Sequence, residues 1–272
     1  SSLFYNCKRM IEIEFSTLFK TSHVQNMDSM FGLCINLASA NVSVFDTRNV
    51  DSMSHMFTEC EKLTSIDITN FNTAKVSDMS SMFYKCASLT SIDLTHLRSP
   101  KLSLATGMFS NCYKLTSIDL SHIQSSTLEK LDEIFDYCSS LVYVDLSNLN
   151  TTNVSEFSKM FRNCSSLTSV DLSGFNTTNI KYMISMFEGC SSMTSIDIGH
   201  FTTSGVYSMS HLFKDCTSLK YINMSNSVFN YKTDIYKDVP NQGTIIVHPD
   251  RVKNAEDYLK QKEWNILLKE SN

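Results

Sequence analysis

The feature that most constrains this chain is a residue pair, Phe-x-x-Cys, that returns every 26 residues. Eight copies keep that spacing: Phe31/Cys34, Phe57/Cys60, Phe83/Cys86, Phe109/Cys112, Phe135/Cys138, Phe161/Cys164, Phe187/Cys190 and Phe213/Cys216. A ninth copy, Phe4/Cys7, stands one residue out of phase, which indicates an insertion between residues 8 and 30. A fixed period of this length is typical of a solenoid, in which each unit buries its apolar side against its neighbours.

Apolar spacing within one unit predicts a strand followed by a helix. Ile92 and Leu94 alternate about Asp93, which is the period of a short strand. In the second half of a unit, positions such as Met79, Met82 and Phe83 fall on one face of a helix about three turns long. A Ser/Thr column before this segment is suited to capping that helix; it comprises Thr47, Thr73, Ser99, Ser125, Thr151, Thr177 and Thr203.

These units predict an α/β fold, a right-handed solenoid of the leucine-rich-repeat type with parallel strands. Strands lie about 4.8 Å apart, whereas packed helices need roughly 8–10 Å. We therefore expect a curved stack with the sheet on the concave side and the helices on the convex side. Right-handed crossovers follow from the handedness rule for parallel strands.

The repeat columns divide the chain into two predicted parts. Residues 1–225 form nine repeats, the first of them truncated, and residues 226–272 form a C-terminal capping segment. Within that segment, Gly243–Val247 reads as a strand, and a helix is expected from Asp250 to about Lys260. The single tryptophan, Trp264, follows.

Composition excludes several functional classes. The net charge of −5 argues against a nucleic-acid partner, which calls for a basic surface. No apolar run is long enough to span a membrane in this fragment. Neither a phosphate-binding glycine loop nor a protease or hydrolase motif occurs, so we expect no enzyme activity, no catalytic residues and no cofactor.

The unit assembled from Leu63–Leu89 and its neighbours, LTSIDLTNFNTxxVSDMSSMFxxCxSL, resembles the BspA-like leucine-rich-repeat surface proteins. The resemblance covers residues 1–225, and the ending GTIIVHPDRVKNAEDYLKQKEW is similar to that family's closing segment. It implies display outside the cell or on the cell surface of a host-associated microbe, binding to host or neighbouring-cell proteins, and no catalytic residues. Residues 95–107 and 121–133 depart from the N-T-x-x-V-x-x-M pattern, so the convex side is expected to differ there.

A column of aspartates is the main candidate binding feature. The side chains are Asp67, Asp93, Asp119, Asp145, Asp171 and Asp197, one on each predicted strand and pointing away from the core. Carboxylates about 5 Å apart repel by roughly 1 kcal/mol per pair in water. Proton sharing with raised pKa values, hydrogen bonds from neighbouring Ser and Thr residues, or weakly bound calcium would offset this repulsion.

Two strands replace the usual Thr-Ser pair by Val142–Tyr143 and Lys220–Tyr221. Exposed aromatic residues are favoured anchors at interfaces, so Tyr143 and Tyr221 are candidate contact residues on the concave face. The stacked cysteines are expected to be free, buried and structural, because equivalent side chains point the same way and do not face each other. No metal site is expected.

These observations favour a non-catalytic protein-interaction module, part of a microbial cell-surface adhesin with an unidentified protein ligand. Two alternatives stay open: a structural spacer or stalk that carries another domain, and a glycan-binding solenoid.

Overall fold

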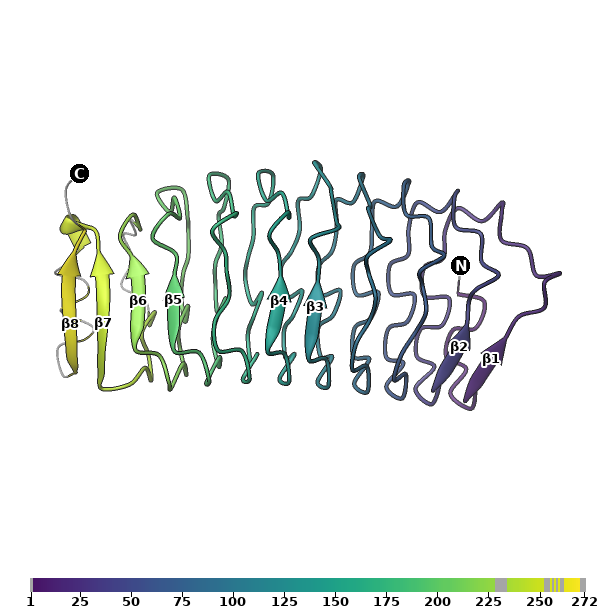
Figure 1. Ribbon diagram of the computed structural model, residues 1–272, viewed down its shortest axis with the longest axis horizontal. Coiled ribbons are helices and arrows are strands. Elements are labelled where there is room, and N and C mark those ends of the chain that lie inside the picture. The colour runs from purple at the N-terminus through teal and green to yellow at the C-terminus, as the bar shows by residue number, and fades with distance from the viewer. Residues whose placement is uncertain are drawn as a thin grey trace.

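In the computed structural model the chain winds into coils stacked side by side along one long axis (Figure 1). The structure describes residues 2–227, 234–251, 255, 257, 259 and 262–269. Its strands are β1 (Glu12–Glu14), β2 (Ser39–Asn41), β3 (Ser117–Asp119), β4 (Tyr143–Asp145), β5 (Ser195–Asp197), β6 (Tyr221–Met224), β7 (Gln242–Val247) and β8 (Glu263–Leu268), with one 3₁₀ turn, η1 (Pro249–Arg251). Every strand pair is parallel. The predicted parallel-sheet solenoid is therefore confirmed.

The wall of the solenoid that carries these strands, here called the strand wall, repeats with the expected register. Ile118 lies opposite Val144, and Ile196 lies opposite Ile222. In the first pair Ile13 lies opposite Ala40, a step of 27 residues, whereas the next bridge joins Asn26 to Ser52. The inserted residue therefore lies between β1 and Asn26, within the predicted interval.

The strand wall is not one continuous sheet. It contains the pairs β1-β2 and β3-β4 and a four-stranded sheet from β5 to β8. Elsewhere on this wall single backbone hydrogen bonds link the coils; for example, the Thr90 N–H donates to the Thr64 carbonyl at 3.3 Å.

The opposite wall, here called the turn wall, contradicts the predicted helices. The N–H groups of Met53, His55, Phe57 and Glu59 donate to carbonyls of the next coil at 2.7 to 2.9 Å. Alternate N–H groups close tight turns within the coil, as when Met56 donates to the Met53 carbonyl at 3.2 Å. Isolated parallel bridges link this wall from Asn26 through to Ser208. The wall is a ladder of turns, not a row of helices.

Left-handed backbone makes these turns possible. Each coil places two residues of the turn wall at positive φ, for example Ser81 at 54° and Lys85 at 58°. A helix cannot continue through such a residue. Met79, Met82, Phe83 and Cys86 nevertheless point into the core and are fully buried, because turns closed three residues apart present the same spacing as a helix face.

This architecture also removes the reason for the predicted curvature. Helices would have held one wall roughly 8–10 Å apart, forcing the sheet to the inside of a curve. Instead the turn wall is held by direct backbone hydrogen bonds between coils, and it is the more continuously bonded of the two walls. The predicted helices on the convex side are therefore wrong, whereas the placement of the strands on the concave side stays a prediction.

A stack of aromatic rings runs through the core. The rings of Phe31, Phe57, Phe83 and Phe109 follow one another at centroid distances of 5.2, 5.6 and 5.5 Å, nearly parallel. The same stack continues through Phe135, Phe161, Phe187 and Phe213. Residues 26 apart therefore lie on top of one another, as the period predicts.

The cysteine column lies beside these rings. No cysteine forms a disulfide, and eight of the nine are buried, whereas Cys7 is exposed. Each buried thiol donates to the carbonyl of a phenylalanine in the preceding coil, as Cys86 does to Phe57 at 3.2 Å. Burial raises the pKa of Cys86 and, to about 12, that of Cys216, so these thiols stay protonated.

The Ser/Thr column does not cap helices either. The Thr47 hydroxyl donates to the Asn72 carbonyl at 3.1 Å and accepts from the Asn72 N–H at 2.7 Å. Thr151 makes the same pair of bonds with Asn176. These buried hydroxyls join successive coils at the corner between the two walls.

At the C-terminal end β7 and β8 extend the sheet. β7 confirms the predicted strand at Gly243–Val247. The Trp264 ring packs on Gly243, where a Cβ would lie 2.7 Å from the ring, and its Nε1 donates to the Pro240 carbonyl at 2.9 Å. The helix predicted from Asp250 to about Lys260 falls largely outside the described residues. Among the described residues, no helical segment has the length and apolar character needed to cross a bilayer.

Candidate interaction site on the strand wall

The aspartate column occupies the outer face of the strand wall, here called the Asp ladder. Each member accepts a backbone N–H two residues on, with distances of 2.8 to 3.0 Å, and so closes the turn after its strand. The six acceptors are Asp67, Asp93, Asp119, Asp145, Asp171 and Asp197. Asn41 and Asn223 make the equivalent bond at 3.1 Å. The turn therefore needs a side-chain oxygen that accepts this N–H, and the amide of Asn serves as well as the carboxylate of Asp.

The pKa values show how the column tolerates its charge. The Thr69 hydroxyl and N–H lower the pKa of Asp67, and Thr95 does the same for Asp93. The N–H of Ser147 lowers the pKa of Asp145. These directions are opposite to those expected for shared protons, so hydrogen bonding to neighbouring Ser and Thr residues offsets the repulsion.

The Asp ladder does not gather into a metal site within the part of the chain that the structure describes. There, no three side chains of His, Cys, Asp or Glu lie together as a metal ion would need. His122 Nε2 lies 3.7 Å from Asp119 Oδ2, an exposed pair. Calcium binding was one of the alternatives that the sequence left open for the ladder, and calorimetry with calcium tests it.

Two neighbouring hollows break the flat strand wall. The first, of about 450 Å³, is lined by residues of two successive coils, including Tyr143, Asp145, Asp171 and Gly174. The second, of about 460 Å³, includes Asp171, Asp197, Gly199, His200 and Asn226. Because Asp171 lines both, the hollows form one depressed strip, here called the corner strip.

Two glycines explain why the wall is hollowed here. Gly174 stands where the preceding coil has Asn148 and the following coil has His200, so a large side chain is missing. Gly199 replaces the usual Ser or Thr, and a Cβ there would lie 2.5 Å from the Asn223 amide. The Asn223 side chain therefore occupies the space beside Gly199, and each hollow has one of these departures from the repeat in its lining.

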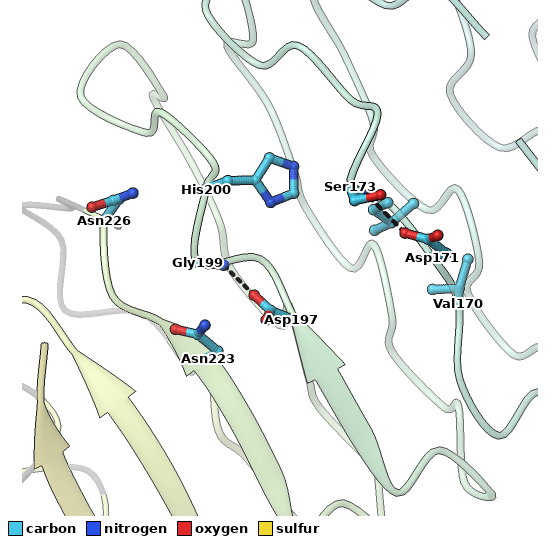
Figure 2. Close-up of a pocket in the computed structure, with 9 residues that line it drawn as sticks. Val170, Asp171, Ser173, Asp197, Gly199, His200, Asn223 and Asn226 are labelled. Carbon is cyan, nitrogen blue, oxygen red and sulfur yellow. Dashed lines mark hydrogen bonds between the residues drawn. The ribbon is translucent and has the colours of Figure 1, made fainter. Parts of the chain in front are cut away.

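Figure 2 shows the second hollow, with Asp197 and His200 on one coil and Asp171 and Ser173 on the preceding one. The His200 ring packs edge-on against the Phe201 ring at a centroid distance of 4.8 Å and extends toward Ser173. The pKa of Asp171 is lowered, chiefly by hydrogen bonds from Ser173 and to a smaller extent by the nearby His200. The strip thus offers hydrogen-bond acceptors of negative charge beside one titratable ring.

The two predicted anchors behave differently. Tyr143 is 58% exposed, lines the first hollow, and its hydroxyl lies 3.5 Å from Asp145 Oδ2. That carboxylate raises the pKa of Tyr143. Tyr221 is 36% exposed and lines neither hollow. The structure therefore brings Tyr143, Asp145, Asp171 and Asp197 together and leaves Tyr221 apart.

Sequence reasoning missed Gly174, Gly199, His200 and Asn226. The signal was available, because both glycines interrupt columns that are otherwise occupied by side chains. An exposed column thus departs from its repeat as much by losing a side chain, as at Gly174, as by gaining one, as at Tyr143.

Comparisons with known proteins identify structures similar to this chain and the family to which it belongs. A comparison with curated proteins finds no match. Among matching solved structures are an internalin (inlF) from Listeria monocytogenes, at 15% identity and a TM-score of 0.36, covering 97% of this chain and 83% of that one. Another is TLR13 in a complex with ssRNA13, at 13% identity and a TM-score of 0.36, covering 89% of this chain and 49% of that one.

A family profile described as "Mycoplasma protein of unknown function, DUF285" matches residues 1–118 and 102–226. Together these two matches cover most of the 272 residues. The chain therefore belongs to the DUF285 family.

Proposed function

We propose that this chain is a non-catalytic protein-interaction module that binds a basic segment of a partner protein along the corner strip. The observation that carries the proposal is that an exposed aromatic side chain lies beside a row of carboxylates that line two adjoining hollows. Tyr143 stands at one end of the strip, and Asp145, Asp171 and Asp197 follow along it.

The chemistry of the carboxylates sets the class of partner. One oxygen of each is committed to its own turn, as Asp171 Oδ1 is to the Ser173 N–H at 2.9 Å. On the strip, hydrogen bonds from Ser147 and Ser173 lower the pKa values of Asp145 and Asp171, so both carboxylates stay ionised at neutral pH. A partner that places Lys or Arg opposite successive coils meets one acceptor per coil.

The cellular setting is part of the same proposal. The similarity of the repeat to BspA-like surface proteins supports a role as part of a microbial adhesin located outside the cell. We also propose that residues 226–272 cap the nine repeats of residues 1–225. The packing of Trp264 on Gly243 supports the cap, because it covers β7 at the end of the stack.

A spacer role is the second candidate, and a different observation favours it. The backbone hydrogen bonds of the turn wall and the ring stack continue from coil to coil without relying on surface side chains. Such a rod holds its length whether or not it binds anything.

A defined binding assay separates these two functions. Peptides selected from a random display library are titrated by fluorescence anisotropy against the wild type and a triple variant, Tyr143→Ser with Asp145→Asn and Asp171→Asn. Each replacement already occurs in its own column, at Ser117, Asn41 and Asn223, so the fold should be retained. Tyr207→Ser, at another exposed tyrosine, is the matched control.

We expect the selected peptides to be rich in Lys and Arg, and the triple variant to bind them at least about tenfold more weakly. Peptides without basic residues, or equal binding by wild type and triple variant, would contradict the proposal and favour the spacer.

A further inference from the structure

A second hollow region lies on the turn wall, between two tyrosines. Tyr5, Gly32, Thr58 and Tyr84 occupy one column in four successive coils. Both tyrosines line an open hollow of about 550 Å³. It is lined by Tyr5, Ser29, Leu33, His55, Thr58, Glu59, Ser81 and Tyr84.

The hollow exists because this stretch of the column is small. Further along the same column stand Asp136 and Arg162, whose side chains pair across coils at 2.6 Å, and then Glu188 and Lys214, which also pair. At Gly32 there is no side chain, and a Cβ would lie 3.1 Å from the Tyr5 ring. The ring of Tyr5 therefore leans over Gly32 and forms one wall of the hollow.

The hollow carries little charge. Among the described residues that line it, Glu59 has the one carboxylate, and Lys85 beside the hollow lies 3.5 Å from Glu59 Oε2 and 3.0 Å from Glu61 Oε1 (distances from Nζ). The remaining polar groups along it are neutral hydroxyls and one imidazole, from Ser29, Ser81 and His55. All three residues have positive φ, in tight turns of the turn wall.

We infer that this hollow binds a neutral carbohydrate, a short oligosaccharide of pyranose units. Aromatic faces carry a negative quadrupole that attracts the weakly positive C–H faces of a sugar ring. Between two such faces, hydroxyl and imidazole groups can donate hydrogen bonds to sugar hydroxyls or accept them, and a carboxylate can accept them. A pocket with aromatic walls, a few convergent polar groups and little charge matches this class of ligand.

The dimensions agree with more than one sugar unit. Three coil steps separate Tyr5 from Tyr84, which places their backbones roughly 14 Å apart at the usual strand spacing. The site lies on the wall opposite the corner strip, so it is independent of the protein-binding role proposed above.

Saturation-transfer NMR on the full chain tests the inference with three named probes. These are maltotriose, cellotriose and triacetylchitotriose, and sialyllactose serves as a charged comparison. Tyr84→Ser removes one wall and has a precedent in its column at Ser110. Thr58→Arg fills the hollow and has a precedent at Arg162. Tyr207→Ser is the control, because Tyr207 is 56% exposed elsewhere on the surface.

We expect saturation transfer to at least one neutral trisaccharide, with affinity reduced about tenfold by Tyr84→Ser and abolished by Thr58→Arg. Tyr207→Ser should leave affinity unchanged. Melting curves matching the wild type show that both test variants are folded. No transfer to any neutral probe, stronger transfer to sialyllactose, or transfer unaffected by the two variants would overturn the inference. The triple variant of the corner strip should bind the sugar normally, so the two proposals can fail separately.

Discussion

Replacing Gly107 tests whether the turn wall consists of turns or of helices, because the two structures predict opposite changes in the free energy of unfolding. It lies at φ 60° in the same column as Ser81, which has φ 54°. A Cβ added at Gly107 would meet its nearest neighbours at 3.6 and 3.7 Å, which are ordinary contacts. Replacement by alanine therefore changes the backbone energy with little change in packing.

The expected magnitude follows from the conformation. An L-residue in the left-handed region costs about 1–2 kcal/mol relative to glycine. Replacing glycine by alanine also reduces the conformational entropy of the unfolded chain, which stabilises the folded state by about 0.4–1 kcal/mol. The backbone strain is the larger effect, so we expect Gly107→Ala to lower the free energy of unfolding by about 1 kcal/mol. In a helix the same replacement would raise it by about 1 kcal/mol.

Urea denaturation followed by circular dichroism measures this difference, with the slope of the transition checked for constancy. Ser81→Gly is the reciprocal variant, and the relief of left-handed strain should leave it within about 0.5 kcal/mol of wild type or more stable. A stabilised Gly107→Ala together with a Ser81→Gly destabilised by about 1 kcal/mol would refute the turn wall and restore the helix.

Further predictions concern the core, the thiols and the Asp ladder. Phe109→Ala should cost about 3–5 kcal/mol in urea denaturation, because the ring is fully buried between two others at 5.5 and 6.2 Å; a cost below about 1 kcal/mol would show that the stack is not a packed core. Ellman's reagent should modify Cys7 alone in the native chain, since the other thiols are buried; rapid reaction of more than one thiol would contradict this. Asp145→Asn should be tolerated, whereas Asp145→Ala should destabilise the chain at neutral pH, because only the former keeps an acceptor for the Ser147 N–H. The folded pKa of Asp145 is lowered, so its contribution is present above the unfolded value of about 3.9 and is lost as pH falls through the folded value. The stability gap between wild type and Asp145→Ala should therefore narrow in acid, and a gap that widens there would disprove the assignment. Calorimetry should show no rise in melting temperature with millimolar calcium, because no three acidic or other metal-ligating side chains meet among the described residues; a clear rise would establish a cation site on the ladder.

The sequence predicted the stacking register because a period is a global constraint. Once Cys60, Cys86 and Cys112 lie in one column, the strands, the ring stack and the outward Asp ladder follow from alternation. The helices were predicted wrongly because buried residues separated by three, one and three positions occur both on one face of a helix and in a run of tight turns. Asn111, Asn163, Gly189 and Asp215, which share one column at positive φ, carried the missing signal, since these residue types are enriched in left-handed backbone.

The candidate sites were less accessible to the same reasoning. Hydrogen bonding to the following turn was one of the alternatives for the Asp ladder, and it is the one that the structure shows. The hollows arise from side chains that are absent, at Gly174, Gly199 and Gly32, and from what neighbouring coils do with the space. These hollows depend on how side chains of neighbouring coils are oriented, and the sequence alone does not give those orientations.

The direction of the turn-wall hydrogen bonds gives the molecule an electrical polarity. Phe31, Phe57, Phe83 and Phe109 each donate toward the following coil. In the coil of Phe57, the N–H groups of Met53, His55 and Glu59 do the same, and only that of Asp51 donates toward the preceding coil, so forward bonds predominate on this wall. Peptide dipoles of about 3.5 D therefore add along the long axis, as they do in a helix, with the negative end at the first coil. Two such rods meeting first coil to first coil would set carbonyl against carbonyl, whereas a further coil joined head to tail would continue the series.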